Sequence, residues 1–426
     1  GMIFTMLGTG ILAALYPAFI IARVSPAEAL KKELRIANRS FPIRKVLITA
    51  QFTISIVMIT STLVIYNQLQ YMRNKDMGVN VDDLLVIDIN SRSLRRNFEA
   101  IKTEFSALSE VSSVSVSSRV PGEWKSYPIA SVLTGGSTAS TDMIFVGADK
   151  DFLKTYDIEL LQGRNFSDAL ADSGKIILSS MAVKQLGLTD PLGQIIEIPT
   201  ARFGGNVEDL DTPFRAEVIG VINDFHFQSL REAMMPMVIG FWNNPIHNID
   251  YYTLKVNLSN FDQTLASLRA INDKFDTENP VEYNLLSNRF EDFYRTDAQR
   301  CQLFLLFSCV IVFIACLGLF ALVSYAVESR TKEIGVRKVL GASVSSIVTM
   351  VSKEFLLLVM IAFVIASPIA YLFMQRWLED FAYKTTMGPG IFAVAGGIAF
   401  VIALLTVSIR SMKAAVVNPV KSLRSE

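Results

Sequence analysis

The chain has 426 residues, of which 51% are hydrophobic and 19% charged, with a formal net charge of zero and a mean hydropathy of +0.38. A soluble chain of this length usually carries more charged residues, so the composition argues against an entirely soluble protein. The hydrophobic residues are concentrated in five charge-free runs around a polar middle segment. The zero net charge is therefore an average over charge-free runs and polar segments, and it says little about which partners the protein binds.

The five runs are long enough to cross a membrane. A helix rises about 1.5 Å per residue and needs about 20 apolar residues to span the hydrocarbon layer. The runs are Met2–Ala22, Val46–Met72, Cys301–Val327, Phe355–Gln375 and Thr385–Ile409, and none contains Asp, Glu, Lys, Arg or His. We therefore predict five transmembrane helices. A signal peptide is the alternative for the first run, although it lacks a basic leader and a clear cleavage site.

Basic residues next to these runs predict the topology. Arg23–Lys45 contains seven Lys or Arg residues, Arg330–Lys338 contains four, and the tail from Arg410 contains four. Under the positive-inside rule these segments are cytoplasmic, and the polar middle segment and the loop 376–384 lie outside. Five spans and a cytoplasmic C-terminus put the N-terminus outside. Because a chain that begins in an outward-facing span is unusual, we expect a C-terminal portion of a longer protein or a truncated gene model.

The polar middle segment, residues 73–300, is predicted to be a mixed α/β domain. Its short, β-branched runs bounded by Gly, Pro, Asn or Asp indicate strands. These are Leu84–Ile89, Val111–Val116, Ile144–Val146, Lys175–Leu178, Gln194–Ile198, Ala216–Val221 and Tyr251–Val256. Helical apolar spacing occurs in Asn97–Leu108, Ser180–Leu186 and Gln263–Phe275, and Gly135–Thr141 has a loop composition. The domain has no cysteine, so its own core must stabilise it.

The sequence contains no recognisable catalytic motif. It has no GxxxxGK[ST], HExxH, CxxC or GxSxG pattern, so we predict no catalytic residue, cofactor or metal site. The histidines are His226 and His247. We interpret His226, which follows an apolar strand, as structural or turn-capping, with a metal ligand as the alternative. The spans lack Asp, Glu, Lys, Arg and His, which argues against an ion- or proton-coupled carrier.

Two smaller features concern the spans. Cys301, Cys309 and Cys316 lie in one broad stripe of the third span, and we interpret them as packing residues, with a metal or redox role as the alternative. Pro26–Lys31 and Pro419–Arg424 repeat a pattern of Pro, then Leu four residues later, then a basic residue. This repeat is consistent with two related halves, the first of which is mostly absent.

The most distinctive segment is Glu328–Ser343. As a helix it places Val336, Val339 and Leu340 on one face. Gly341 is predicted to end this helix, and Ser343 to cap the next one. The segment is interpreted either as an amphipathic helix in the lipid headgroups or as a docking element for a cytoplasmic protein.

The same segment resembles the signature of the FtsX-like permease domain of MacB-type ABC transporters, in the form common among Bacteroidota permeases. Further stretches resemble this family and keep its order along the chain. They are Gln51–Ile56, Leu161–Ser167, Ala182–Leu188 with Asp190–Gly193, Gly220–Leu230 and Trp377–Tyr383. The resemblance covers the chain from about residue 20 to its end.

The resemblance implies an α-helical transmembrane protein, with five spans here, and a mixed α/β extracytoplasmic MacB-type core domain. Such permeases have two four-span halves and work as dimers with separate ATP-binding subunits. This chain matches the last span of the first half and the whole second half. The implied domains are a span (1–22), a cytoplasmic linker (23–45), a span (46–72), the periplasmic core domain (73–300), the FtsX-like permease domain with three spans (301–409) and a cytoplasmic tail (410–426).

The resemblance also implies a coupling region that faces the ATPase. Its candidate residues are Glu328, Arg330, Lys332, Glu333, Gly335, Arg337, Lys338 and Gly341. ATP-driven closure of the ATPases would move the spans and, through Met72 and Arg300, the outer domain. The expected location is the bacterial cytoplasmic (inner) membrane. The expected partners are the ATPase, a second permease copy, the lipid bilayer and a periplasmic partner or cargo, but no nucleic acid.

Three functions remain open at this point. The first is the permease subunit of an ABC transporter that exports or extracts a hydrophobic or amphipathic cargo. The second is an FtsX-like regulator of a periplasmic partner such as a cell-wall hydrolase. The third is a membrane-anchored enzyme or sensor without an ATPase.

Overall fold

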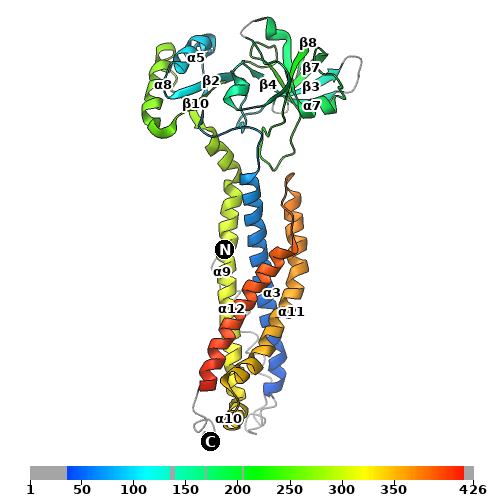
Figure 1. Ribbon diagram of the computed structural model, residues 1–426, viewed down its shortest axis with the longest axis vertical. Coiled ribbons are helices and arrows are strands. Elements are labelled where there is room, and N and C mark those ends of the chain that lie inside the picture. Colours follow the sequence, from blue (N-terminus) through cyan, green and yellow to red (C-terminus); the bar gives the residue numbers. More distant parts are fainter. Residues whose placement is uncertain (1–35, 135–139, 168–169, 204–205, 417–426) are drawn as a thin grey trace. The chain divides into compact units, whose positions relative to one another are not determined.

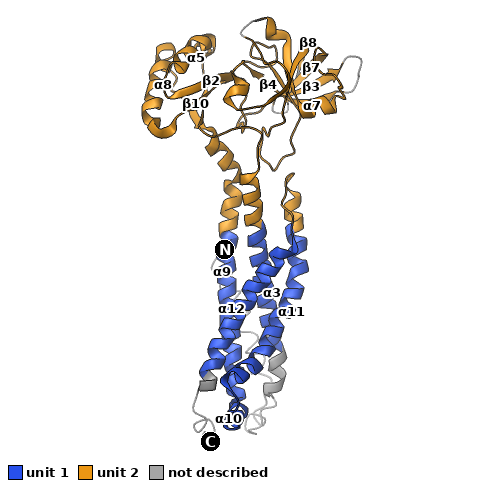
Figure 2. Ribbon diagram, in the orientation of Figure 1, with its two compact units in different colours: residues 1–64, 303–374, 387–426 blue, residues 65–302, 375–386 orange. Residues whose placement is uncertain are grey.

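The computed structural model describes residues 36–134, 140–167, 170–203 and 206–416. The predicted first span, most of the linker that follows it and both halves of the proline repeat lie outside these ranges. The chain forms two compact units (Figure 2). We call residues 65–302 and 375–386 the core unit, and the described residues of 1–64, 303–374 and 387–426 the helical unit.

Among the described residues, four long helices and one short helix contribute to the helical unit (Figure 1). They are α3 (Ile36–Asn74), α9 (Leu286–Ser329), α10 (Thr331–Val339), α11 (Val344–Glu379) and α12 (Pro389–Val416). Within the described ranges, four helices are long and apolar enough to cross a membrane, which agrees with four of the five predicted spans. The last helix begins at Pro389 and not at Thr385, because proline favours the first turn of a helix.

Small residues allow α11 and α12 to pack closely. Alanines spaced four residues apart are almost fully buried on both helices, namely Ala362, Ala366 and Ala370 on α11 and Ala395, Ala399 and Ala403 on α12. A Cβ atom on Gly396 would come within 2.5 Å of the Phe363 ring, so any side chain here would force the ring to move. Such small-residue stripes are typical of helix contacts in membranes.

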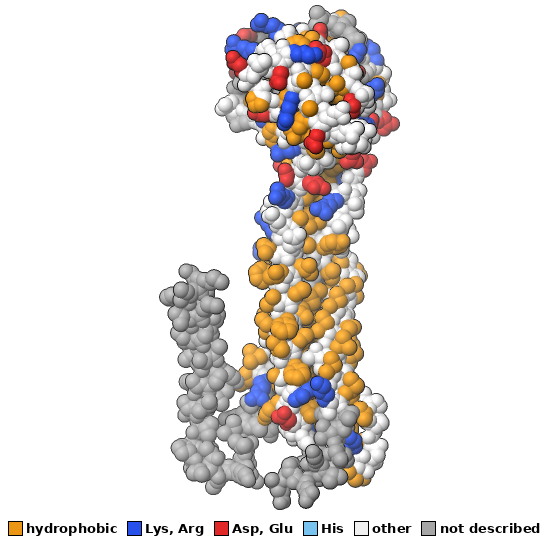
Figure 3. All heavy atoms as spheres, turned by 90° about the vertical axis from the view of Figure 1, so that its left-hand side faces the viewer, with side chains coloured by type: hydrophobic (Ala, Val, Ile, Leu, Met, Phe, Trp, Pro, Cys, Tyr) orange, Lys and Arg blue, Asp and Glu red, His pale blue; other side chains and the backbone are white. Residues whose placement is uncertain are grey.

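The outward surface of the helical unit is hydrophobic. Figure 3 shows hydrophobic side chains over most of its length, with charged side chains gathered near one end. Exposed large residues include Phe313, Val364, Leu372 and Phe373, which are 63%, 66%, 65% and 73% exposed. An apolar surface of this extent suits a lipid environment.

The core unit is built on an 11-stranded sheet. Its strands are β1 (Leu84–Asp88), β2 (Val111–Ser117), β3 (Ile129–Thr134), β4 (Thr141–Ala148), β5 (Leu160–Gly163), β6 (Lys175–Ser179), β7 (Ile195–Phe203), β8 (Asn206–Ile222), β9 (Met237–Phe241), β10 (Tyr251–Val256) and β11 (Tyr283–Leu285). The short helices are α4 (Arg92–Arg96), α5 (Phe98–Ser106), α6 (Phe152–Thr155), α7 (Ser180–Gln185), α8 (Phe261–Phe275) and the 3-10 turns η1 (Leu170–Gly174) and η2 (Leu258–Asn260).

Two halves of this sheet differ in topology. β9 pairs in parallel with β4, which closes β4, β3, β7, β8, β6 and β9 into a ring. The ring encloses apolar side chains such as Phe145, Leu178 and Val218. In the other half, β11, β1, β10 and β2 pair antiparallel, and α5 and α8 pack against them through residues such as Phe105 and Leu268.

The predicted strands are all present, but four observed strands were not predicted. β3, β5, β9 and β11 are short or lack alternating polarity, so their local patterns are weak. The predicted helices correspond to α5, α7 and α8. Residues 135–139 of the predicted loop lie outside the described ranges, and its last residue, Thr141, begins β4.

Candidate coupling site

The distinctive segment forms α10, and its end has the expected geometry. Gly341 has φ +89°, a left-handed conformation that glycine adopts without strain. The Gly341 N–H donates to the Lys338 carbonyl (3.1 Å), and the Ala342 N–H donates to the Arg337 carbonyl (3.0 Å). These two bonds constitute a Schellman motif. The prediction that Gly341 ends the helix is confirmed.

The predicted cap of the next helix is also present. Ser343 precedes α11, and its Oγ accepts a hydrogen bond from the Ser346 N–H at 3.3 Å. This is an N-cap, which satisfies one of the free N–H groups of the first turn. The backbone of the connection between α10 and α11 is therefore fixed by the Schellman motif at one end and by the Ser343 cap at the other.

One side of α10 is anchored, while the other is open. Ile334 is 6% exposed and packs with Ile347 of α11, which is 2% exposed. The predicted apolar face lies on the surface, with Val336, Val339 and Leu340 exposed by 49%, 65% and 79%. A short helix thus presents three aliphatic side chains while its opposite side holds it to α11.

Charged residues border this apolar face. Arg337 Nη2 lies 2.8 Å from Glu333 Oε1 in an i,i+4 pair, and Arg337 Nη1 donates to Met350 Sδ at 2.7 Å. Both charged side chains are about half exposed, at 50% and 47%, so the pair stabilises the helix only slightly. The two charges are accessible for contact with a partner.

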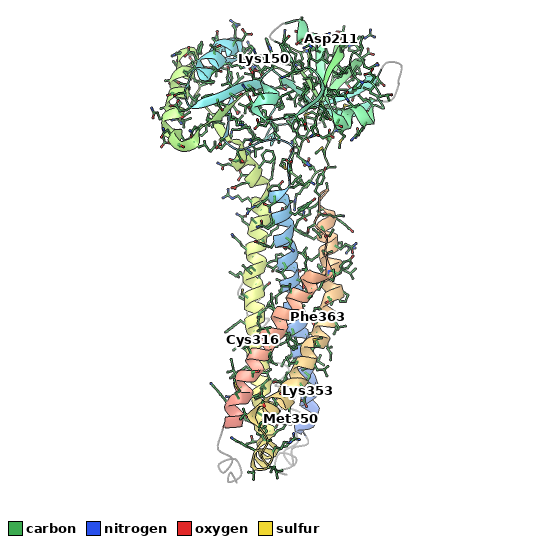
Figure 4. The ribbon with its side chains drawn as sticks, in the orientation of Figure 1. Lys150, Asp211, Cys316, Met350, Lys353 and Phe363 are labelled. Carbon is green, nitrogen blue, oxygen red and sulfur yellow. The ribbon has the colours of Figure 1, made fainter. Side chains whose placement is uncertain are left out.

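A carboxylate that the sequence analysis missed connects three helices at this site. Glu354 Oε1 of α11 accepts a hydrogen bond from Arg330 Nη2 at 2.9 Å. Its other oxygen lies 3.8 Å from Lys45 Nζ of α3. Figure 4 shows Met350 and Lys353 on the same part of α11. An acidic residue directly before a charge-free run was the available signal, but its partners could not be read from the sequence.

Two arginines strengthen the same end of the helical unit. The Arg44 guanidinium of α3 stacks 4.6 Å from the Tyr325 ring centroid of α9. Arg410 Nε of α12 donates to Ser324 Oγ of α9 at 2.8 Å. Together with Glu354, these contacts join α3, α9, α11 and α12 next to α10.

The other predicted site residues are less closely connected. Glu328 is exposed near the end of α9, and its carbonyl accepts a hydrogen bond from Thr331 Oγ1 at 2.8 Å. Gly335 is buried on the anchored side of α10, whereas Lys338 is half-buried. The side chain of Lys332 lies outside the described part of the structure. Of the predicted coupling residues, Arg330, Glu333, Arg337 and Gly341 are therefore the ones with defined contacts at this site.

The sequence matches two protein families. Residues 46–271, more than half of the chain, match the family described as MacB-like periplasmic core domain. Residues 305–419 match the FtsX-like permease C-terminal family. No curated protein matches the chain.

Solved structures with similarity to the core unit have low sequence identity. The periplasmic region of MacB from Actinobacillus actinomycetemcomitans is 16% identical, with a TM-score of 0.34, covering 53% of this chain and 98% of that one. The extracellular domain of the noncanonic ABC-type transporter YknZ from Gram-positive bacteria is 16% identical, with a TM-score of 0.32 and coverages of 47% and 98%. A domain of a candidate permease protein from Porphyromonas gingivalis is 15% identical, with a TM-score of 0.31 and coverages of 47% and 88%.

Proposed function

The chain belongs to the family of permeases that combine a MacB-like periplasmic core domain with an FtsX-like permease region, and we propose that it couples ATP hydrolysis by a separate subunit to movement of its core unit. Members of this family are typically non-catalytic membrane subunits that work with ABC ATPases and form dimers. The proposed cargo is hydrophobic or amphipathic and is exported or extracted from the membrane.

The continuity of α9 carries this proposal. The helix runs without interruption over 44 residues, about 66 Å, and α10 begins two residues after its end. Its first turns belong to the core unit, where Leu286, Phe290 and Tyr294 are 0%, 7% and 5% exposed. β11 directly precedes the helix and pairs with β1, so α9 continues from the sheet. An uninterrupted helix of this kind would carry a displacement at α10 to the core unit.

Contacts of α9 with the core unit support this transmission. The Arg289 guanidinium lies 4.9 Å from the Trp124 ring centroid. A Cβ atom on Gly122, which has φ +76°, would come within 3.0 Å of the Phe290 ring. Because Phe290 packs this closely, the first part of α9 would move together with the loop between β2 and β3.

We assign the contact with the ATPase to α10. Val336, Val339 and Leu340 would fill an apolar groove of the partner, and Glu333 and Arg337 would select it by charge. The remaining predicted residues, Glu328, Arg330, Lys332, Gly335, Lys338 and Gly341, would shape or flank this surface. In this proposal α10 and the C-terminus are cytoplasmic and the core unit is periplasmic, with the domain boundaries that the family resemblance implies.

Affinity purification of the tagged, full-length permease in mild detergent tests the proposal. Mass spectrometry should identify a stoichiometric ATP-binding subunit that is lost in Glu333→Lys or Arg337→Glu. Lys413→Glu, which reverses an exposed charge on α12, should retain it and serves as the control. If a folded permease retains no ATPase, the chain is instead a stand-alone membrane-anchored binding protein.

A further inference from the structure

Two segments that the sequence analysis singled out meet in the core unit. They are Gly220–Leu230, which includes the end of β8, and Trp377–Tyr383, which includes the last residues of α11 and the start of the loop after it. The Ala382 N–H donates to the carbonyl of Arg231, the residue directly after the first segment, at 2.9 Å. The connection between α11 and α12 is therefore bonded to the backbone of the core unit.

A buried glutamine holds the same connection to α3. Gln68 is fully buried, and its side-chain Nε2 donates to the Tyr383 carbonyl at 2.8 Å. Its Oε1 accepts from the Thr385 N–H, also at 2.8 Å. Both ends of the amide are thus satisfied by the backbone of residues 383–385, so opening this contact would leave buried polar groups without partners.

Arg231 links the connection to α9. Its guanidinium lies 4.5 Å from the Phe381 ring centroid, and its Nη2 lies 3.1 Å from Asp297 Oδ1. Asp297 of α9 is only 2% exposed and has a second partner in Arg300, at 3.3 Å. A buried carboxylate is costly without such partners, so Arg231 has a defined position.

Aromatic contacts complete the junction around Tyr383. Its ring packs edge-on against His226, with 4.8 Å between the ring centroids. Lys75 Nζ lies 4.6 Å from the Tyr383 ring centroid. The Leu230 N–H donates to Tyr294 Oη of α9 at 3.4 Å. Residues 381–385 therefore contact α3 and the segment after β8 directly. They are linked to α9 through Arg231 and Leu230.

We propose that residues 381–385 are a latch that stays closed and transmits displacement of α11 and α12 into the core unit. α3 and α9 are each covalently continuous with the core unit and would supply two connections to it. The latch adds a third connection, from α11 and α12. The role of the latch in transmitting movement rests on the proposed function. The closed junction itself can be tested without an ATPase. The residues that position the latch are Gln68 and Arg231.

The first experiment measures hydrogen exchange of the full-length permease alone, in lipid nanodiscs, by mass spectrometry. Peptides that contain the amides of Ala382, Tyr383 and Thr385 should exchange slowly. Gln68→Leu should speed this exchange about tenfold or more, because it removes both partners of the loop at similar side-chain size. Asp380→Asn changes an exposed charge directly before the latch and should have no effect. Fast exchange in the unaltered protein would overturn the latch.

The second experiment adds the co-purifying ATPase, with and without ATP. Unaltered permease and Asp380→Asn should show an ATP-dependent change in exchange across the core unit. Gln68→Leu and Arg231→Met should bind the ATPase equally well and hydrolyse ATP, yet lose most of that change. If both variants retain the full change, the latch transmits nothing and the inference is wrong. If the unaltered protein shows no ATP-dependent change although the latch amides are protected, the proposed function fails and the closed junction remains.

Discussion

Glu354 in α11 accepts a hydrogen bond from Arg330, which lies between α9 and α10, at 2.9 Å. The same carboxylate lies 3.8 Å from Lys45 in α3. Since these side chains are about one-third exposed, the ion pairs themselves stabilise the fold by about 1 kcal/mol or less. Their role is to orient the start of α10 relative to α3 and α11, and they add little to the stability of the fold.

Replacing Glu354 should therefore impair coupling more than stability. We expect Glu354→Gln to lower ATP-dependent activity of the reconstituted complex about 3- to 10-fold, with normal membrane insertion. Combining Arg330→Glu with Glu354→Arg should recover part of the loss, and Lys353→Gln, at the exposed neighbouring position, serves as the control. Equal activity of Glu354→Gln and the unaltered protein would contradict a positioning role.

Glu333 and Arg337 should matter because they contact the ATPase, and not because their ion pair stabilises α10. An exposed i,i+4 pair stabilises a helix by only about 0.3–0.5 kcal/mol, so reversing either charge should leave α10 folded. We expect each reversal to abolish ATP-driven cargo movement in proteoliposomes, because the ATPase no longer binds. The double variant Glu333→Arg/Arg337→Glu restores the pair within the helix. Recovery in that variant would show that only the pair matters and would remove the assigned ATPase contact.

The Schellman motif predicts a graded effect at Gly341. A Cβ atom there would meet no atom within 4 Å, so only the backbone conformation opposes a side chain. Gly341→Ala should weaken the motif by about 1 kcal/mol, and Gly341→Asn should cost less because asparagine tolerates the left-handed region. Hydrogen exchange at the Ala342 amide measures this directly, and identical exchange in both variants would argue against the motif.

Two glycines of the core unit provide a matched test of close packing. Gly163 and Gly187 have φ +76° and +66°, but a Cβ atom on Gly163 would come within 2.1 Å of the Ile219 carbonyl oxygen, whereas Gly187 has open space. Gly187→Ala should cost about 1 kcal/mol of unfolding free energy, and Gly163→Ala at least about 2 kcal/mol more. The chain has three tryptophans, Trp124, Trp242 and Trp377, all in the core unit, so their fluorescence during thermal unfolding reports on this unit. Equal shifts for the two variants would show that Ile219 does not constrain Gly163.

Asp172 predicts acid sensitivity of the core unit. Arg164 contacts both of its carboxylate oxygens, at 3.1 and 2.8 Å. The Arg164 guanidinium, assisted by hydrogen bonds from Ser167, holds the pKa of Asp172 well below its usual value. The resulting stabilisation is present above the unfolded pKa of about 3.9 and is lost as the pH falls below that value.

The variant Asp172→Asn should remove this contribution. At pH 7 we expect a loss of about 1–3 kcal/mol, because the arginine and serine donors lose their charged acceptor. Between pH 5 and about pH 3 the stability of the variant should fall less steeply than that of the unaltered protein. Tryptophan fluorescence during unfolding, measured over a pH series, reports both effects. If stability falls with the same slope below pH 5 in the variant and in the unaltered protein, this ion pair does not cause the acid sensitivity.

Local patterns in the sequence were sufficient for the four described spans, for α5, α7 and α8, for many of the strands and for the C-terminal end of α10. The short helices α4 and α6 were not predicted. The charge-free runs, the glycine at position 341 and the serine at position 343 each act within a few residues, through hydrophobicity, backbone conformation or a cap. For the same reason the exposed face of α10 could be predicted from helical spacing alone. The short strands β5 and β11 were missed because their order depends on neighbours that lie far away in the sequence.

The tertiary structure alone determined which distant groups meet. Glu354 could have been a solvated charge at a helix end, yet it pairs with Arg330 and Lys45. Gln68 reads as one polar residue in an apolar helix, and only the fold places it against the backbone of residues 383–385. The parallel pairing of β4 with β9 likewise has no local signature. Such contacts arise because buried polar groups and open strand edges must find partners, and the folded chain, not the local pattern, decides which partners are within reach.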